Sequence, residues 1–184
     1  MRYDIYDFDG TVYRHESESR FYLFCLLRRP YILPLLPYQL FGLALRLTKR
    51  GSQKWMRRFF CFLHLVDSEK LVRQFWQRER KNIREFFLPQ NREHLAVVCS
   101  ASPQFLLEPI CDMFAVDILV CTKLDSGKIL RGKEKVPAIL AAVPNAEFLR
   151  AYSDKPKLDA PMLALASEQY WVKRSGEIVL INEY

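Results

Sequence analysis

Apolar residues follow two kinds of pattern along the chain. Short, nearly continuous apolar runs predict buried strands in the run that ends at Asp7 and at residues 95–99, 116–121, 148–152 and 170–172. Segments in which apolar side chains recur every three or four positions predict helices at residues 104–114, 136–143 and 160–166. Strands that alternate with helices in this way are typical of a parallel sheet covered by helices on both faces.

Between the first two predicted strands the pattern is helical throughout. Polar residues 13–20 predict a loop, and the apolar residues 21–47 predict short helices joined by bends at Pro30, Pro34 and Pro37. The spacing of apolar residues predicts an amphipathic helix at residues 55–66. Asp67 is a typical N-cap, so a further helix is expected to run from there toward Phe87.

The predicted fold class is therefore α/β: a doubly wound, mostly parallel sheet that carries an inserted all-helical cap subdomain. Residues 1–15 and 89–184 are expected to form the α/β core, and residues 16–88 the cap. Two hairpins are also expected, one with its turn at residues 125–128 and one in the tail that follows residue 175.

Charge is distributed unevenly between these two parts. The cap holds 15 Lys and Arg against 6 Asp and Glu, a net charge of +9, whereas the rest of the chain carries −2. Such an excess favours an anionic partner, which is a phosphate, an anionic lipid surface or a nucleic acid. No nucleic-acid-binding motif accompanies it, so no nucleic acid is expected. The alternative interpretation is a solvated helical face.

One segment of the cap has no charge at all. Residues 30–45 follow Arg28 and Arg29, contain only one polar side chain besides the tyrosines, and precede further basic residues. The segment is shorter than a spanning helix requires and is interrupted by prolines. It is expected either to lie at an anionic membrane surface or to pack inside the helical cap.

The cysteines and the N-terminus bear on location. Five cysteines, an odd number without C-x-x-C spacing, indicate buried free thiols in a reducing compartment, with neither a zinc site nor a disulfide framework. The N-terminus lacks the apolar stretch of a signal peptide. A cytoplasmic location follows as the expectation, with a peripheral position at the inner membrane face as the alternative.

Carboxylates follow two of the predicted strands. Asp7 and Asp9 stand two positions apart, so their side chains leave the strand end on the same side. Two like charges at this separation need a cation between them or a proton on one of them. Ser100 and Asp154 follow two other strands, and parallel strands bring their carboxyl ends to one edge of the sheet. Oxygen ligands without His or Cys favour Mg²⁺.

These motifs together resemble those of the haloacid dehalogenase-like superfamily of hydrolases. The sequence DFDGTVY, a strand that ends in Ser100, Lys135 at the start of a helix, and YSD with Asp159 five residues later occur in the superfamily's order. The resemblance implies Asp7 as nucleophile, Asp9 as general acid and base, and Lys135 as the balancing cation, with Lys133 as its competitor. It implies a phosphate-binding site formed by Gly10, Thr11, Ser100, Ala101 and Ser102. It implies Mg²⁺ bound by Asp7, the Asp9 carbonyl and Asp154, with support from Asp159.

Finer resemblances concern the substrate. The segments VVCSASP and AYSDKPKLDAPML resemble the phosphoserine phosphatase-like branch (subfamily IB), in which a type-1 helical cap selects the substrate. The cap and tail resemble phosphatidylglycerophosphatase C-type lipid phosphatases. The implied function is Mg²⁺-dependent hydrolysis of a phosphate monoester, either a small phosphorylated metabolite or a lipid phosphate such as phosphatidylglycerophosphate.

One residue departs from the superfamily pattern. Lys155 stands where a small hydroxyl residue commonly follows the last metal-binding Asp, and a cation there either weakens Mg²⁺ binding or faces the substrate phosphate. The alternative function is therefore a degenerate member that binds a phosphorylated ligand or an anionic membrane through its basic cap. Dehalogenation fits poorly, because that reaction leaves Asp9 without a leaving alkoxide to protonate.

Overall fold

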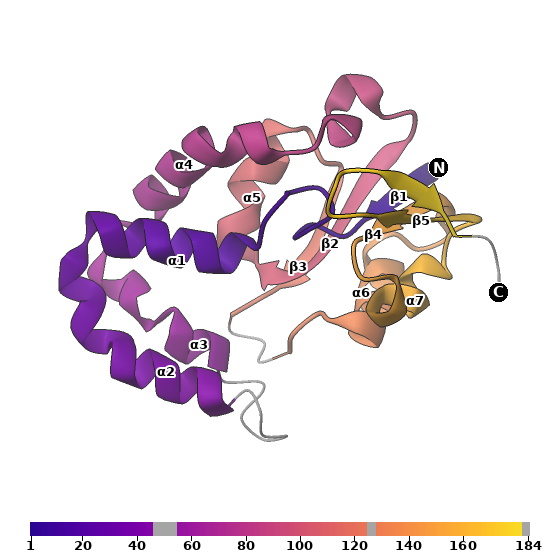
Figure 1. Ribbon diagram of the computed structural model, residues 1–184. Helices are drawn as coiled ribbons and strands as arrows, with labels where there is room; N and C mark the ends of the chain where they lie inside the picture. Colours follow the sequence, from indigo (N-terminus) through magenta and orange to yellow (C-terminus); the bar gives the residue numbers. More distant parts are fainter. Residues whose placement is uncertain (46–54, 125–127, 182–184) are drawn as a thin grey trace.

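Six strands form one sheet in the order β3-β2-β1-β4-β5-β6 (Figure 1). The computed structural model describes residues 1–45, 55–124 and 128–181. The strands are β1 (Arg2–Tyr6), β2 (Leu95–Pro103), β3 (Ile118–Thr122), β4 (Glu147–Ser153), β5 (Glu168–Val172) and β6 (Ile178–Leu180). The first five run parallel, and β6 pairs antiparallel with β5. The predicted doubly wound fold and the C-terminal hairpin are confirmed.

Alternate residues of the central strands face two separate layers of the core. Tyr6 and Val98 pack in a cluster with α5 (Gln104–Met113), whereas Ile5 and Val97 pack in a second cluster with α6 (Lys135–Ala142) and α7 (Pro156–Leu163). Side chains of a strand alternate between faces, so α5 covers one face and α6 and α7 cover the other. This layering places the carboxyl ends of β1 and β2 at an open edge.

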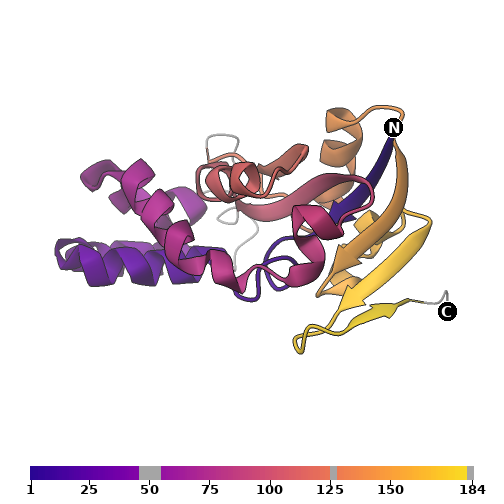
Figure 2. The same cartoon turned by 90° about the horizontal axis from the view of Figure 1, so that it is seen from above.

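The chain between β1 and β2 forms the helical part, which extends to one side of the sheet (Figure 2). Its α-helices are α1 (Ser17–Arg28), α2 (Leu36–Leu45), α3 (Trp55–Phe59) and α4 (Ser68–Glu79). Its short 3₁₀ segments are η1 (Pro30–Leu35), η2 (Cys61–Leu65), η3 (Arg80–Asn82), η4 (Glu85–Phe87) and η5 (Pro89–Asn91). The bend expected at Pro30 is confirmed, whereas Pro34 lies inside η1 and Pro37 lies in the first turn of α2. Asp67 caps α4 by accepting from the Lys70 amide at 3.0 Å.

The helical part and the sheet share one hydrophobic cluster. Phe21 of α1 and Phe75 and Trp76 of α4 belong to the same buried cluster as Leu106 of α5. Trp76 also donates from Nε1 to the Leu106 carbonyl at 2.6 Å. The helical part is therefore anchored to the sheet domain through α4 and α5.

The predicted loop at residues 13–20 is wrong in its second half, because α1 already begins at Ser17. The Ser17 amide at the first turn of α1 donates to Asp9 Oδ1 at 2.6 Å. An amide at a helix start needs an acceptor, and here the acceptor lies eight residues upstream. The sequence around Ser17 gives no sign that Asp9 accepts this hydrogen bond at the start of α1.

Two other helices of the cap are shorter than predicted. The helix expected at residues 55–66 ends at Phe59, because Phe60 and Phe62 are both buried and one face of a continuous helix does not hold residues two positions apart. The helix expected to run toward Phe87 ends at Glu79. Beyond it the chain returns beside the first loop, where the Arg84 amide donates to the Val12 carbonyl at 2.9 Å.

Three boundaries in the core also differ from the predictions. Strand β2 continues past Cys99 to Pro103, and its pairing with β3 shifts register between Ser100 and Pro103. Helix α7 starts at Pro156, four residues earlier than expected, because proline fits the first turn of a helix. The turn predicted at residues 125–128 lies mostly outside the described residues, and the described residues flanking it, 123–124 and 128–131, form no strand.

The five cysteines are free; Cys25, Cys99 and Cys111 are buried, as predicted, whereas Cys61 and Cys121 are only partly buried. None of the helices described here combines the length and the apolar character that crossing a membrane requires.

Candidate active site

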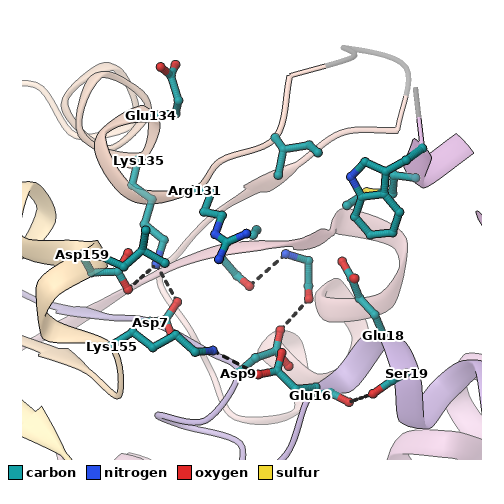
Figure 3. Close-up of a pocket in the computed structure, with 17 residues that line it drawn as sticks. Asp7, Asp9, Glu16, Glu18, Ser19, Arg131, Glu134, Lys135, Lys155 and Asp159 are labelled. Atoms are coloured by element: carbon teal, nitrogen blue, oxygen red, sulfur yellow. Dashed lines mark hydrogen bonds and ion pairs between the residues drawn. The ribbon is translucent and has the colours of Figure 1, made fainter. Parts of the chain in front are cut away.

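A cavity of about 690 Å³ opens between the carboxyl ends of β1 and β2 and the helical cap. Residues that the sequence predicted for the site line it from the sheet domain: Asp7, Asp9, Ser100, Ala101, Ser102, Lys135 and Asp159. The cap contributes Glu16, Glu18, Ser19, Trp55 and Met56. The predicted strand ends therefore meet at a cavity that the cap also encloses (Figure 3).

Lys135 lies at the centre of a buried ion-pair cluster. Its Nζ contacts Asp7 Oδ1 at 2.6 Å and Asp159 Oδ2 at 3.1 Å, and only 3% of the side chain is exposed (Figure 3). Burial alone would lower the pKa of Lys135, but the two carboxylates outweigh it and raise the pKa. Lys133, the alternative that the sequence left open, is exposed. Lys135 is thus the cation that balances Asp7.

Asp159 holds Lys135 from the other side. It lies inside α7 and does not cap that helix, and its Oδ2 also accepts from the Ser153 hydroxyl at 2.8 Å. Ser153 in turn accepts from the Lys155 amide at 3.0 Å. The sequence placed Asp159 in support of a metal, and the structure places it in contact with Lys135.

Asp9 occupies a desolvated position beside the cavity. Its carboxylate accepts from the Ser17 amide at 2.6 Å and from the Ser102 hydroxyl at 2.5 Å. Burial raises the pKa of Asp9 to about 7, and Asp7 adds to the rise, whereas the two serine hydrogen bonds oppose it. A carboxyl group with a pKa near neutrality can both give and take a proton, as general acid and base catalysis requires.

Thr11 connects Asp7 with Asp154, the residue that follows β4. The Thr11 hydroxyl donates to Asp7 Oδ2 at 3.3 Å and accepts from the Asp154 amide at 2.7 Å. Thr11 is fully buried and does not line the cavity. Its contacts fix the relative positions of two carboxylates that leave neighbouring strands.

Asp154 carries an unused ligand atom. Among the described residues, the buried Asp154 Oδ1 has no hydrogen-bond partner. Burial and then the negative charge of Asp7 raise the pKa of Asp154, which reaches about 6 although the charge of Lys155 lowers it. An unpaired buried oxygen next to a second carboxylate is the environment that a bound cation relieves.

These residues fit a single Mg²⁺ ion. Mg²⁺ in phosphoryl-transfer sites takes one or two protein carboxylates and fills its other positions with water and substrate oxygens. Asp7 and Asp154 supply such a pair, while the Asp9 carboxylate is occupied by Ser17 and Ser102. The described part of the chain contains no group of three or more His, Cys, Asp or Glu side chains arranged to hold a metal. The fit thus rests on two carboxylates.

Gly10 allows the first loop to lie against Asp154. Its φ is +83°, and a Cβ on Gly10 would overlap Asp154 Oδ2. Only glycine adopts this backbone without strain, and only glycine leaves room for the carboxylate. Gly10 itself does not line the cavity.

Replacing Gly10 by alanine is therefore expected to displace Asp154. Gly10→Ala should lose about 1–3 kcal/mol of unfolding free energy and require a higher Mg²⁺ concentration for activity. Gly176→Ala is the matched control, because Gly176 also has a positive φ of +102° but a Cβ there meets only the end of the Arg84 side chain. Both variants should show lower thermal stability, and equal Mg²⁺ dependence in the two would refute the role of Gly10.

Three residues predicted to bind phosphate, Ser100, Ala101 and Ser102, lie in the last part of β2. The register shift after Ser100 leaves Ala101 and Ser102 out of the regular pairing with β3, at the cavity. The Ser102 amide donates to the Ser100 hydroxyl at 3.1 Å. Backbone amides and hydroxyls at such a bend are suitable donors to phosphoryl oxygens.

Lys155 lies beside the candidate metal site. Its Nζ contacts Glu16 Oε1 at 3.0 Å and Asp154 Oδ2 at 3.5 Å, so it bridges the start of the cap and the end of β4. Lys155 therefore pairs with Asp154 Oδ2, and among the described residues Asp154 Oδ1 still has no hydrogen-bond partner. Lys155 also lines the cavity and can face a bound anion there.

Sequence reasoning missed several contributors. Ser17 positions Asp9, eight residues earlier, and Ser153 positions Asp159, six residues later. No sequence motif indicates either contact. Arg131 points into the cavity near Lys135 (Figure 3). A second basic residue close to the predicted Lys135 was the available signal for Arg131.

The chain belongs to the family of haloacid dehalogenase-like hydrolases, whose model matches residues 5–164. A search of the curated proteins gave no significant match.

Solved structures share the fold at low sequence identity. A protein of unknown function from Bordetella pertussis Tohama I is 17% identical with a TM-score of 0.59, over 91% of this chain and 88% of that one. A phosphoserine phosphohydrolase-like protein from Francisella tularensis subsp. tularensis SCHU S4 is 16% identical with a TM-score of 0.51, over 92% and 86%. A HAD family hydrolase from Salmonella enterica subsp. enterica serovar Typhi is 14% identical with a TM-score of 0.53, over 90% and 60%. At these identities the likeness concerns the fold alone.

Proposed function

We propose that the protein is a Mg²⁺-dependent phosphatase that hydrolyses a phosphate monoester through an aspartyl-phosphate on Asp7. The observation that carries the proposal is the pairing of Asp7 with Lys135 at 2.6 Å beside Asp9, whose pKa is about 7. An ionised nucleophile next to a carboxyl group poised to carry a proton is what a two-step phosphoryl transfer requires. We assign residues 16–88 as the cap that encloses the substrate.

In the first step a carboxylate oxygen of Asp7 attacks the phosphorus, and the bond between phosphorus and the ester oxygen breaks. Asp9 donates its proton to the leaving alkoxide. Lys135 stays protonated beside Asp7 and balances the negative charge that gathers there. Ser100, the amides after it and Arg131 line the cavity, and in this proposal they bind the phosphoryl oxygens.

In the second step water attacks the phosphorus of the aspartyl-phosphate. Asp9, now ionised, takes the water's proton, and the bond between phosphorus and the Asp7 oxygen breaks to release inorganic phosphate. Asp7 and Asp154 would hold the Mg²⁺ ion, which neutralises charge on the phosphoryl group when bound. Both aspartates return to their starting protonation states.

The finer assignment within the family is also a proposal. The resemblance to the phosphoserine phosphatase-like branch and to phosphatidylglycerophosphatase C-type enzymes suggests a small phosphorylated metabolite or a lipid phosphate as substrate. The cavity volume of about 690 Å³ leaves room for a sizeable leaving group, and Trp55, Met56 and Ile129 supply apolar surface for it. The alternative is a binding protein without turnover, which the Lys155–Asp154 contact favours.

An assay panel tests the proposal. The full chain is incubated with an aryl phosphate, phosphorylated metabolites and phosphatidylglycerophosphate, with Mg²⁺ and with chelator. The proposal expects phosphate release that stops with chelator and returns when Mg²⁺ is restored. Thermal stabilisation by phosphate without any turnover would instead establish the binding protein.

The raised pKa of Asp9 predicts a pH effect on stability. Because the pKa of Asp9 is about 7 in the folded state and 3.8 in an exposed aspartate, folding is favoured by protonation, and that stability is lost as the pH rises from about 4 through 7. Asp9→Asn removes the titration and keeps an acceptor for Ser17. Without metal, the variant should nearly match the wild type at pH 4 and exceed it at pH 8 by roughly 3–4 kcal/mol of unfolding free energy. Denaturant titrations at both pH values measure this, and a difference that does not change with pH would be incompatible with it.

A further inference from the structure

Helix α2 has its polar and apolar sides reversed. On the side that is buried it places Gln39 and Gly42, while Tyr38, Leu40 and Phe41 are 50%, 54% and 57% exposed. Gln39 is held inside by two hydrogen bonds, from the Tyr22 hydroxyl at 2.6 Å and to the Phe59 carbonyl at 3.0 Å. A surface helix of a soluble domain normally buries its apolar side. Here the packing against the protein is polar, and the apolar side faces outward.

The close contact of α2 with α3 maintains this orientation. A Cβ on Gly42 would overlap the Cβ of Arg58, so the glycine lets the two helices approach. Rotating α2 to bury Leu40 and Phe41 would break both bonds of Gln39 and lose this approach. The outward apolar side is therefore part of the folded cap.

The exposed apolar residues form a surface that continues into η1. We define the apolar cap surface as the following exposed residues: Tyr31, Leu33, Tyr38, Leu40, Phe41 and Leu43. They come from two consecutive elements that contact each other. A large group of exposed apolar side chains, surrounded by polar residues, typically marks an interaction site.

The chain that carries this surface is rich in basic residues. Residues 19–66 contain nine Lys and Arg and no Asp or Glu. Arg28, Arg29 and Arg57 are exposed, and the guanidinium of Arg58 lies 5.8 Å from the Phe41 ring centroid. A partner for this surface must be apolar at its centre and anionic around it.

We propose that the apolar cap surface docks on an anionic lipid bilayer. Helix α2 would lie in the plane of the membrane interface, with Leu40 and Phe41 among the acyl chains and the arginines at the headgroups. A lipid surface fits because apolar chains and anionic headgroups stand side by side in it. The docking does not depend on the proposed phosphatase activity.

Docking would also bring the active-site cavity close to the membrane. Helix α3 packs along α2, and its Trp55 and Met56 line the cavity. Helices α2 and α3 would then lie between the bilayer and the cavity.

Vesicle sedimentation tests the proposal with the full chain. Wild-type protein should sediment with vesicles of phosphatidylcholine and phosphatidylglycerol, much less with pure phosphatidylcholine, and less at high salt. Leu40→Glu/Phe41→Glu should weaken partitioning by about tenfold or more. Leu140→Glu is the matched control, because Leu140 is 46% exposed on α6 of the sheet domain, and it should bind as the wild type does.

Two further measurements keep the result unambiguous. Thermal unfolding of the double variant should match that of Leu140→Glu, so that lost binding is not lost folding. Asp7→Asn should sediment like the wild type, which separates docking from catalysis. The proposal is overturned if wild type does not sediment with anionic vesicles, or if the double variant binds equally well. It is also overturned if wild type is a dimer that the double variant dissociates and no vesicle binding occurs, since a second copy then covers the surface.

Discussion

Asp7→Asn is expected to reduce phosphate release by on the order of 10⁴-fold or more, with little change in thermal stability. The amide cannot attack phosphorus, whereas its single oxygen can still accept from Lys135, which contacts Asp7 Oδ1 at 2.6 Å, and only the longer contact of Thr11 with Asp7 Oδ2 at 3.3 Å loses its acceptor. Loss of kcat with retained folding separates a nucleophile from a structural acid.

Initial rates on an aryl phosphate and a melting curve measure the two effects. Asp112→Asn is the control, because it makes the same substitution at an exposed position of α5 and should retain full activity. If Asp7→Asn kept more than a few per cent of the wild-type rate, Asp7 would not be the nucleophile. The hydrolase would then act directly through water.

Lys135→Met is expected to have the largest effect on stability. Methionine has a similar length but no charge, so the variant leaves the carboxylates of Asp7 and Asp159 buried beside each other without their cation. Removing one partner of a buried ion pair costs about 3–5 kcal/mol. Activity should fall as well, because the charge on Asp7 loses its counterion.

Chemical denaturation at neutral pH measures the loss of unfolding free energy. Lys133→Met serves as the control: it lies two residues earlier in the adjoining 3₁₀ turn, is exposed, and should change stability by less than about 0.5 kcal/mol. Similar losses of unfolding free energy in the two variants would show that the ion pairs of Lys135 with Asp7 and Asp159 contribute little to stability.

The fold was predictable because its signals are local. Apolar runs gave five parallel strands, and Asp67 gave the start of α4. The errors fall where distant residues decide. The start of α1 is stabilised by a hydrogen bond from the Ser17 amide to Asp9, eight positions earlier. Helix α4 ends before the chain returns beside the first loop, where the Arg84 amide bonds to the Val12 carbonyl. No local pattern records such contacts.

The sequence predicted several residues that the structure brings together at the cavity, but it did not predict their contacts. Repulsion between Asp7 and Asp9 suggested a proton or a cation, and the structure shows Lys135 beside Asp7 and a raised pKa for Asp9. The main cause of that rise is burial, with repulsion from Asp7 a smaller one. Burial of a carboxyl group depends on the cap that closes over it. The sequence alone did not show how closely α1 approaches Asp9.

The reversed helix α2 also illustrates what sequence leaves open. Residues 30–45 were expected either to pack inside the cap or to face a membrane surface. The structure exposes most of their apolar side chains and buries Gln39 instead. Which side of an apolar helix is buried depends on Tyr22 and Phe59, the partners of Gln39.

The central claim is that phosphate passes through a covalent bond to Asp7, and trapping that bond tests it most directly. Asp9→Asn lacks the base for the second step, whereas an aryl phosphate has a leaving group that departs without a proton donor. After acid quench, mass spectrometry of the peptide that contains Asp7 should therefore show one added phosphoryl group in Asp9→Asn, and none in Asp7→Asn. An unmodified peptide during measured burst release of the aryl alcohol, or a phosphoryl group on another residue, would contradict the account.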